Sequence, residues 1–402
     1  MFNRKEKILL AILAIIQFSH IVDFMIMMPL GPQIMRLFSI PPQKFGFLVS
    51  SYNFAAGLSG LLASFFIDKY DRKKALLFVY VGFALATLSC ALSKEYSSLL
   101  FSRALTGVFG GVLNSLILSV LSDSFESSRR GSAMGILMTS FSFASIMGVP
   151  MSLFLANHFS WHAPFVFLGL ISLLIIFVAG FTLPSMNQHL KGPHQHQNPL
   201  LNVIGIAANP NQVLALTFLF ILILGQFTVI PFLSSTFVAN AGLQEAQLPL
   251  IYLVGGCFTI FSSPMIGRLS DKIGKRKIFL ITSTISIPVI LFMTQLGQTP
   301  LWIILAGAAL FFVCTGGRMI PAMALITTTS TPQKRGSFMS ITSSVQQVAS
   351  AFSSFLAGLI IIQSPEGMIL HYNYVGYLAA LCTVIAMFLI LRIKSVEDKE
   401  AL

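Results

Sequence analysis

The sequence predicts an all-α polytopic membrane protein in which twelve transmembrane helices form two pseudo-symmetric six-helix bundles. Three observations predict this fold class: a strongly apolar composition, long apolar runs along the whole chain, and a polar motif that occurs once in each half. Of the 402 residues, 55% are hydrophobic and only 9% are charged, whereas soluble globular proteins carry roughly a quarter charged residues. Most of the chain is therefore expected to lie in lipid.

Each apolar run is about twenty residues long, which is enough to cross a hydrocarbon core of roughly 30 Å. Because lipid offers no hydrogen-bond partners to the backbone, such runs cross the membrane as helices. The twelve expected spans lie near residues 8–30, 45–67, 75–93, 97–121, 133–156, 163–183, 211–235, 247–267, 278–297, 301–327, 337–362 and 370–391.

A polar stretch from Pro184 to Asn211 divides these runs into two groups of six. The expected domains are an N-terminal bundle over 1–183, a cytoplasmic linker over 184–211 and a C-terminal bundle over 212–402. The linker contains His189, His194 and His196, but this tract is short and irregular, so we expect no metal there. The four cysteines stand singly in apolar runs, and no spacing predicts a metal, a disulfide or another cofactor site.

The net charge of +12 describes membrane topology and does not require a nucleic-acid partner. With a cytoplasmic N-terminus, most of the 25 lysines and arginines fall in cytoplasmic loops and termini, and only Arg36, Lys44 and Lys94 fall on the opposite side. Lys and Arg are enriched in cytoplasmic loops. We therefore predict a multi-pass protein of the inner or plasma membrane with both termini in the cytoplasm.

A polar motif follows the second span, from Ser64 to Lys74, and recurs after the eighth, from Gly267 to Lys277. Both copies resemble the loop signature of the major facilitator superfamily, although the first has Ser64 and Asp71 where glycines are expected. The resemblance implies two related halves that rock to expose a midplane cavity alternately to each side. The motif residues that we expect to act as conformational latches between the halves are Asp68, Arg72, Asp271, Gly274 and Arg276. The two aspartates would cap a neighbouring helix N-terminus.

Asp23 is the one acidic residue that lies well inside a span. A charged group in lipid costs at least about 2.5 kcal/mol on insertion scales, so its presence suggests a function. At about 1.5 Å per residue, Asp23 lies about 22 Å from the inner end of its helix and Arg103 about 9 Å from the outer end of its own. The two depths are similar and allow an ion pair. His20 lies one turn before Asp23 and can share its face as a proton relay.

The stretch from Arg103 to Gly111 resembles the fourth-helix signature of proton-coupled members of the superfamily, in which the arginine is associated with proton transfer. A neighbouring cation favours the ionised carboxylate, whereas desolvation favours the protonated one. If transport separates Asp23 from Arg103, Asp23 should take up a proton. The alternative is a static ion pair that holds two helices together.

Several polar residues inside spans are candidates for lining the substrate cavity: Asn53, Asn114, Gln226, Arg318, Gln346 and Gln347. Arg318 has no intramembrane acid in its own half. It would bind an anionic substrate group, donate hydrogen bonds into the cavity, or reach Asp23, and the sequence leaves these three open.

The segments Gly148–Pro150 and Trp161–Phe165 resemble the fifth-helix pattern of drug and sugar exporters, except that His162 replaces the usual arginine. We expect a monomeric secondary active transporter that couples protons to export of a small, lipophilic molecule. The alternative is a facilitator or importer of a small polar nutrient such as a sugar. No nucleotide loop, metal triad or nucleophile–base pair predicts an enzyme, and no soluble domain predicts a receptor.

Overall fold

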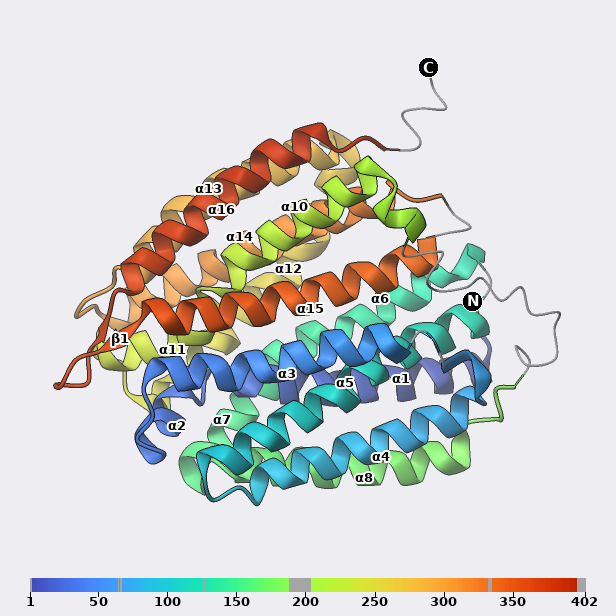
Figure 1. Ribbon diagram of the computed structural model, residues 1–402, viewed down its shortest axis with the longest axis horizontal. Helices are drawn as coiled ribbons and strands as arrows, with labels where there is room; N and C mark the ends of the chain where they lie inside the picture. Colours follow the sequence, from blue (N-terminus) through green and yellow to red (C-terminus); the bar gives the residue numbers. More distant parts are fainter. Residues whose placement is uncertain are drawn as a thin grey trace. The chain divides into compact units, whose positions relative to one another are not determined.

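The computed structural model describes residues 2–63, 65, 67–125, 127–187, 204–331 and 335–395, and its backbone is almost wholly helical (Figure 1). Among these residues, eleven helical segments are long and apolar enough to cross a membrane. The remaining expected span forms α15 (Arg335–Ile360), which is also long enough but is rich in serine and contains Gln346 and Gln347. The predicted all-α polytopic fold class is confirmed. The three linker histidines lie outside the described residues.

The chain packs as two compact units, which are described separately. Unit 1 comprises Met1–Met27 and Ser51–Gln197, and unit 2 comprises Met28–Ser50 and Asn198–Leu402. Helix α3 (Pro42–Ala63) contributes to both. The other elements of unit 1 are α1 (Arg4–Ile26), η1 (Ile67–Lys69), α4 (Arg72–Ala91), α5 (Tyr96–Ser124), α6 (Ser127–Phe143), η2 (Ala144–Gly148), α7 (Val149–His158) and α8 (Ala163–Thr182). Those of unit 2 are α2 (Gly31–Leu37), α10 (Pro210–Phe227), α11 (Ile230–Ala239), η4 (Glu245–Gln247), α12 (Leu248–Ile273), α13 (Lys275–Thr294), α14 (Leu301–Thr327), α15, β1 (Ile362–Gln363), β2 (Ile369–Leu370) and α16 (Tyr372–Arg392).

The predicted boundaries at 1–183, 184–211 and 212–402 stay a prediction, because most of the linker lies outside the described residues. The packing groups residues 28–50 with unit 2. A close approach of two glycines explains this grouping: a Cβ on Gly46 of α3 would lie 2.7 Å from the carbonyl oxygen of Ser354 and 2.9 Å from the Cα of Gly358 on α15. Ser354 and Gly358 therefore form a close-packing surface on α15. Nearby, Gln43 donates to the carbonyl of Ile361 at 3.0 Å.

Helix ends follow recognisable sequence signals. Asn3 and Glu6 form a reciprocal capping box at the start of α1, with both bonds at 2.8 Å. Two predicted spans are interrupted where proline removes a backbone donor. The span near 133–156 has a π-helical turn at Ala144–Gly148 just before Pro150, and the span near 211–235 breaks between α10 and α11 just before Pro231.

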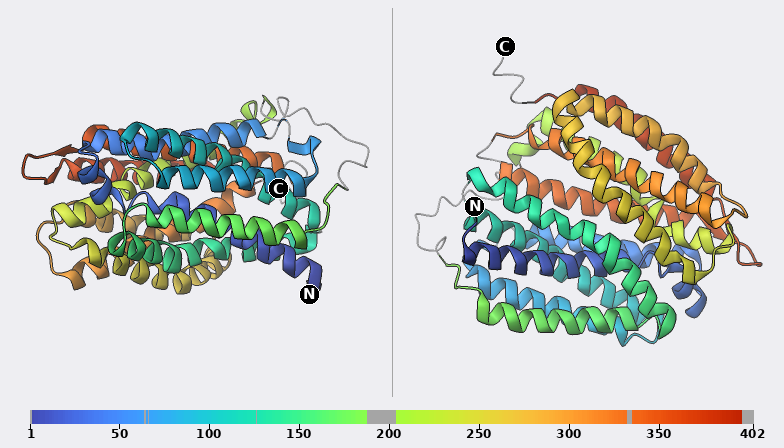
Figure 2. Two further views of the ribbon diagram at one scale, coloured as in Figure 1. Left: turned by 90° about the horizontal axis from the view of Figure 1, so that it is seen from below. Right: turned by 180° about the vertical axis from the view of Figure 1, so that it is seen from behind.

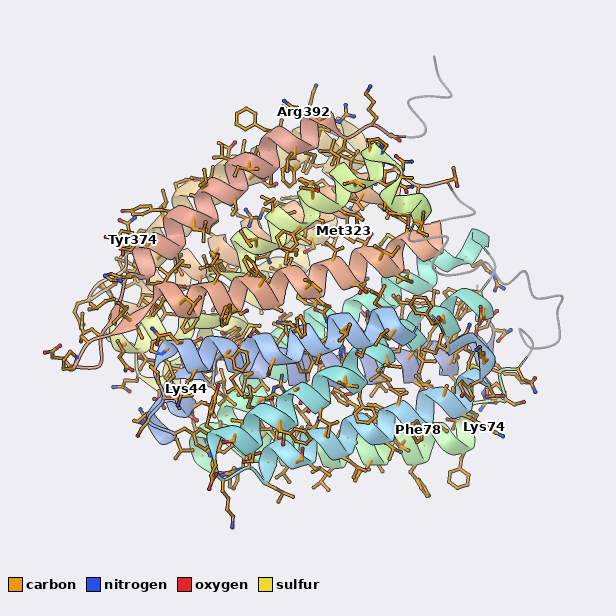
Figure 3. All side chains as sticks on the ribbon, in the orientation of Figure 1. Lys44, Lys74, Phe78, Met323, Tyr374 and Arg392 are labelled. Carbon is orange, nitrogen blue, oxygen red and sulfur yellow. The ribbon has the colours of Figure 1, made fainter. Side chains whose placement is uncertain are left out.

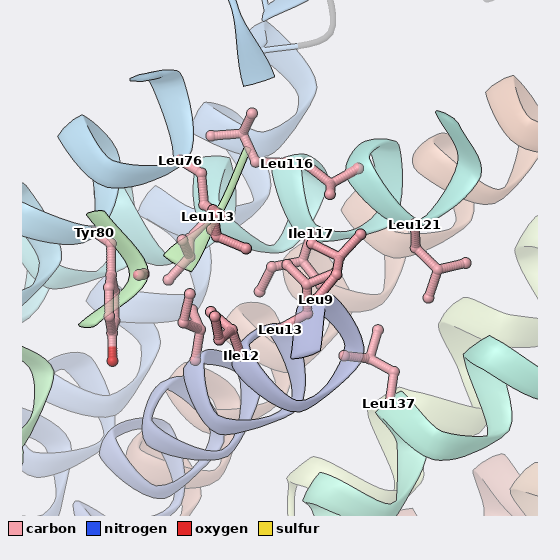
Figure 4. Close-up of a cluster of buried hydrophobic side chains, with 14 of the residues drawn as sticks. Leu9, Ile12, Leu13, Leu76, Tyr80, Leu113, Leu116, Ile117, Leu121 and Leu137 are labelled. Atoms are coloured by element: carbon pink, nitrogen blue, oxygen red, sulfur yellow. The ribbon is translucent and has the colours of Figure 1, made fainter. Parts of the chain in front are cut away.

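Unit 1 is held together by an apolar cluster on α1, α4 and α5 (Figure 4), and α4 lies beside α8 in every view (Figure 2). Two glycines of α5 lie against the backbone of α3. A Cβ on Gly111 would overlap the carbonyl oxygen of Ala56, and one on Gly107 would overlap that of Tyr52. By contrast, Phe78 projects away from α4 and is 75% exposed (Figure 3), as expected of a side chain that faces lipid.

Candidate functional site

The expected ion pair between Asp23 and Arg103 is present in unit 1. Nη1 of Arg103 on α5 donates to Oδ2 of Asp23 on α1 at 2.8 Å. The Asp23 side chain is 0% exposed and that of Arg103 is 1% exposed. Two opposite charges that are removed from water repay their desolvation only when they are well paired. The geometry provides that pairing, since each charge has the other as its direct partner.

Two residues that the sequence analysis did not select complete the surroundings of this pair. Oγ1 of Thr87 on α4 donates to the other carboxylate oxygen of Asp23 at 3.2 Å. The guanidinium carbon of Arg103 lies 4.5 Å from the ring centroid of Tyr52 on α3, a cation–π geometry. The pair is therefore held by four helices of one unit. Threonine and tyrosine are common in apolar helices, so neither residue carried a signal in the sequence.

His20 lies in the same buried region but is not hydrogen-bonded to Asp23. Its ring centroid is 6.4 Å from that of Tyr52 and 5.7 Å from that of Phe83. Among the described residues, neither ring nitrogen has a hydrogen-bond partner, and the side chain is 7% exposed. An unpartnered imidazole one turn from the carboxylate is compatible with a relay but does not form one in this conformation. Its role stays a prediction.

The polar cavity candidates fall in different environments. In unit 1, Asn114 accepts a hydrogen bond from Gln17 at 3.5 Å, and Asn53 is fully buried. In unit 2, the half-buried candidates are Gln226, Gln346 and Gln347. The structure thus brings Asn114 together with Gln17. A role for any of the five in a substrate cavity stays a prediction.

Arg318 on α14 is fully buried in unit 2, at 0% exposure. Its Nη1 donates to Oγ of Ser286 on α13 at 3.2 Å and to Oγ1 of Thr383 on α16 at 2.8 Å. The arginine is conspicuous in the sequence as an intramembrane charge, but neither hydroxyl partner carries a sequence signal. Within the described part of the chain, no acidic side chain contacts its guanidinium.

The repeated loop motif makes the same kind of contact in each unit. At the start of α4, Lys73 donates to the carbonyl of Leu183, which caps the end of α8, at 2.6 Å. At the start of α13, Arg276 donates to the carbonyl of Ile393, which caps the end of α16, also at 2.6 Å. The two basic residues therefore tie a helix start to the end of the last helix of their own unit.

The other motif residues have local roles. Arg72 is buried and pairs with Asp123 at 2.9 Å within unit 1. Asp71, which stands where a glycine was expected, caps α4 by accepting from the backbone N–H of Lys74 at 3.1 Å. Gly274 joins α12 to α13 at φ 109°, a conformation that L side chains rarely adopt.

The two aspartates expected to act in the latch are not seen in that role. Asp271 is exposed in the last turn of α12, and it has no hydrogen bond or ion pair with another described residue. The Asp68 side chain lies outside the described part of the structure. The latch between halves therefore stays a prediction.

Chemically, the Asp23 site can hold and release a proton. A buried carboxylate that loses its cationic partner becomes an uncompensated charge, and protonation removes that charge. A helix movement that draws Arg103 and Thr87 away from Asp23 would therefore favour proton uptake. Their return would favour proton release.

Comparison with known proteins identifies the family. The Major Facilitator Superfamily profile matches residues 13–293 and 215–401. An uncharacterised MFS-type transporter of Bacillus subtilis, YceJ, is 24% identical over 369 residues, covering 91% of each chain. Multidrug resistance protein 2 of Bacillus subtilis is 21% identical over 291 residues, covering 70% of this chain and 72% of that protein.

A solved structure of a mutant of the nucleoside transporter NupG resembles this chain with a TM-score of 0.76 at 14% identity, covering 96% of this chain and 99% of that one. This likeness shows the fold. The family and the named relatives are transporters of small molecules and not enzymes. The protein is therefore a multi-pass membrane transporter, and the chain belongs to the major facilitator superfamily.

Proposed function

We propose that this transporter is a proton-coupled exporter of a small, lipophilic molecule and that Asp23 carries the coupled proton. The observation that carries the proposal is the buried pair of Asp23 and Arg103, 2.8 Å apart and almost fully removed from solvent. A buried carboxylate in a membrane helix is costly and is typical of proton relays in transporters. Its position deep inside a spanning helix supports a working role.

In the proposed cycle, the ion pair alternates between two arrangements. In the paired arrangement, Arg103 and Thr87 donate hydrogen bonds to Asp23, and the neighbouring cation favours the ionised carboxylate. When the halves rock, or when a substrate enters, the cation moves away and Asp23 takes up a proton from the side that is then open. Re-formation of the ion pair expels the proton on the other side. Two half-reactions of this kind exchange protons for substrate without any covalent chemistry.

Export rather than import is supported by the relatives. Multidrug resistance protein 2, whose name refers to drug resistance, matches 70% of this chain at 21% identity, and resistance to a drug is consistent with its removal from the cell. The excess of lysine and arginine in alternate loops supports cytoplasmic termini and an inner or plasma membrane location. We further propose that the transporter acts as a monomer made of two six-helix bundles joined by the 184–211 linker.

The second candidate function is a facilitator or importer of a small polar nutrient such as a sugar. The observation that favours it is the group of half-buried amides in unit 2, Gln226, Gln346 and Gln347. Amide side chains both donate and accept hydrogen bonds, which suits a substrate with many hydroxyls. In this alternative the Asp23 pair is a fixed structural contact.

The test uses purified protein in liposomes that contain a pH-sensitive dye. Ethidium is the lipophilic-cation probe, and a radiolabelled pentose is the probe for the alternative. We expect an imposed pH gradient to drive ethidium accumulation in wild-type vesicles. Asp23→Asn should abolish both this accumulation and ethidium-driven proton movement, while leaving some ethidium binding. Arg103→Ala should weaken the coupling, and His20→Ala should have a smaller effect.

Glu366→Gln is the matched control, because Glu366 is exposed in the turn between β1 and β2 and outside the spans. It should leave proton-driven accumulation unchanged. If Asp23→Asn vesicles still concentrate ethidium against its gradient, Asp23 does not couple the proton and the proposal is wrong. Equal downhill pentose flux in wild type and Asp23→Asn, with no proton movement, would favour the facilitator.

A further inference from the structure

Among the residues that the structure describes, two arginines are fully buried, and they differ in one respect. Arg103 has a carboxylate partner, Asp23, at 2.8 Å. Arg318 is equally buried, yet its only hydrogen-bond partners among the described residues are two neutral hydroxyls, those of Ser286 and Thr383. Hydroxyl lone pairs satisfy N–H groups, but they do not neutralise a charge. Burying an ion without a counter-charge costs several kcal/mol.

The unpartnered atoms of Arg318 lie along one edge of its guanidinium. Both hydroxyls accept from the same nitrogen, Nη1. The other two nitrogens, Nε and Nη2, are buried and have no hydrogen-bond partner in the described part of the chain. These two nitrogens share the side-on edge of the planar group, from which two parallel N–H bonds point outward. Such an edge matches the two oxygens of a carboxylate.

A third buried donor lies on the neighbouring helix. Ser283 stands one turn before Ser286 on α13, its side chain is 0% exposed, and its Oγ has no hydrogen-bond partner among the described residues. Of the described titratable groups, the thiols of Cys314 and Cys382 lie near Arg318, and no acidic side chain among them contacts its guanidinium. The described surroundings therefore supply hydrogen-bond donors and one positive charge, without a competing acid.

We propose that the Nε–Nη2 edge of Arg318, with Ser283, binds a small monovalent anion in unit 2, and specifically a carboxylate group. The anion supplies the counter-charge that Asp23 supplies to Arg103. Its source is either a free inorganic anion or the carboxylate of a transported organic acid. Only the second source rests on the proposed transport function. The binding site itself uses residues of unit 2 alone and does not depend on proton coupling through Asp23.

The test measures the apparent melting temperature of the purified protein at constant ionic strength while sodium acetate or sodium chloride is titrated. At about a hundred times its dissociation constant, a ligand adds about 2.7 kcal/mol of stability, so acetate should raise the wild-type melting temperature saturably by several degrees. Arg318→Gln should lose this rise, and Ser283→Ala should weaken acetate binding. Arg392→Gln, which removes an exposed arginine at the end of α16, is the charge-matched control and should keep it.

If Arg318→Gln does not fold, Arg318→Lys retains the charge, removes the two-atom edge, and should weaken acetate at least tenfold. A rise with acetate but not with chloride assigns the site to carboxylates. An equal rise with both anions overturns the carboxylate assignment, because the site would then bind an inorganic anion as well as it binds acetate. A rise with neither anion, or one that persists in Arg318→Gln, overturns the site. Asp23→Asn should retain the acetate response, so that failure of proton coupling and failure of this site are distinguishable.

Discussion

The Asp23–Arg103 pair makes a quantitative prediction about stability. Removing one partner of a fully buried ion pair leaves an uncompensated charge and costs about 3–5 kcal/mol. Because the two side chains are 0% and 1% exposed, Asp23→Asn and Arg103→Met should each destabilise the protein by about that amount. The double variant leaves no uncompensated charge. It should therefore cost less than either single variant, so that the sum of the two single effects exceeds the double effect by at least about 3 kcal/mol.

The assay is reversible unfolding of the detergent-solubilised protein by sodium dodecyl sulfate, followed by circular dichroism. The matched control is the pair of Arg36 and Glu245, which is 2.7 Å apart but has exposed fractions of 69% and 20%. Hydrogen bonding to Glu245 raises the pKa of Arg36, so Arg36 stays charged. An exposed pair is worth about 0–1 kcal/mol, and its double-mutant cycle should show a correspondingly small coupling. Additive effects at Asp23 and Arg103, or an equally large coupling in the control, would refute the argument from burial.

Two further predictions follow from packing and from the repeated motif. Gly111→Ala should destabilise the protein by about 1–3 kcal/mol in the same unfolding assay, because the new Cβ overlaps the Ala56 carbonyl oxygen. Gly135→Ala is the control and should be near neutral, because a Cβ there has no neighbour within 4 Å. Equal effects of the two substitutions would contradict the close approach of the helices at Gly111. Asp271→Asn should increase cytoplasmic labelling of introduced cavity cysteines more than Asp68→Asn does, because the second motif copy retains its glycines. Equal or reversed labelling would rule out the asymmetric latch.

The sequence alone was sufficient for the fold class and for identifying the intramembrane charges that need a partner. Apolar runs of about twenty residues have one stable form in lipid, so the helical spans could be predicted without any tertiary information. The cost of a charge in lipid made Asp23, Arg103 and Arg318 conspicuous.

The partners of those charges were decided by tertiary structure. Thr87 and Tyr52 complete the Asp23 site from helices that are distant in sequence, and nothing distinguishes them from other hydroxyl residues in apolar helices. The main-chain carbonyl that Arg276 binds, at Ile393, has no sequence signature at all, because every residue carries the same carbonyl. The spacing of residues along the sequence could not distinguish between the three possible roles of Arg318 either.

The grouping of residues 28–50 with unit 2 is a second feature that tertiary packing decided and local sequence did not. Chain order places this segment with its sequence neighbours, whereas its packing depends on the fit of Gly46 against α15, which is far away in the sequence. The sequence by itself determined which segments enter the membrane and which charges need a partner, because those follow from the free energy of transfer of each segment. Only the tertiary structure decided which atoms meet those charges, because hydrogen bonds and ion pairs depend on the positions of helices that local sequence does not specify.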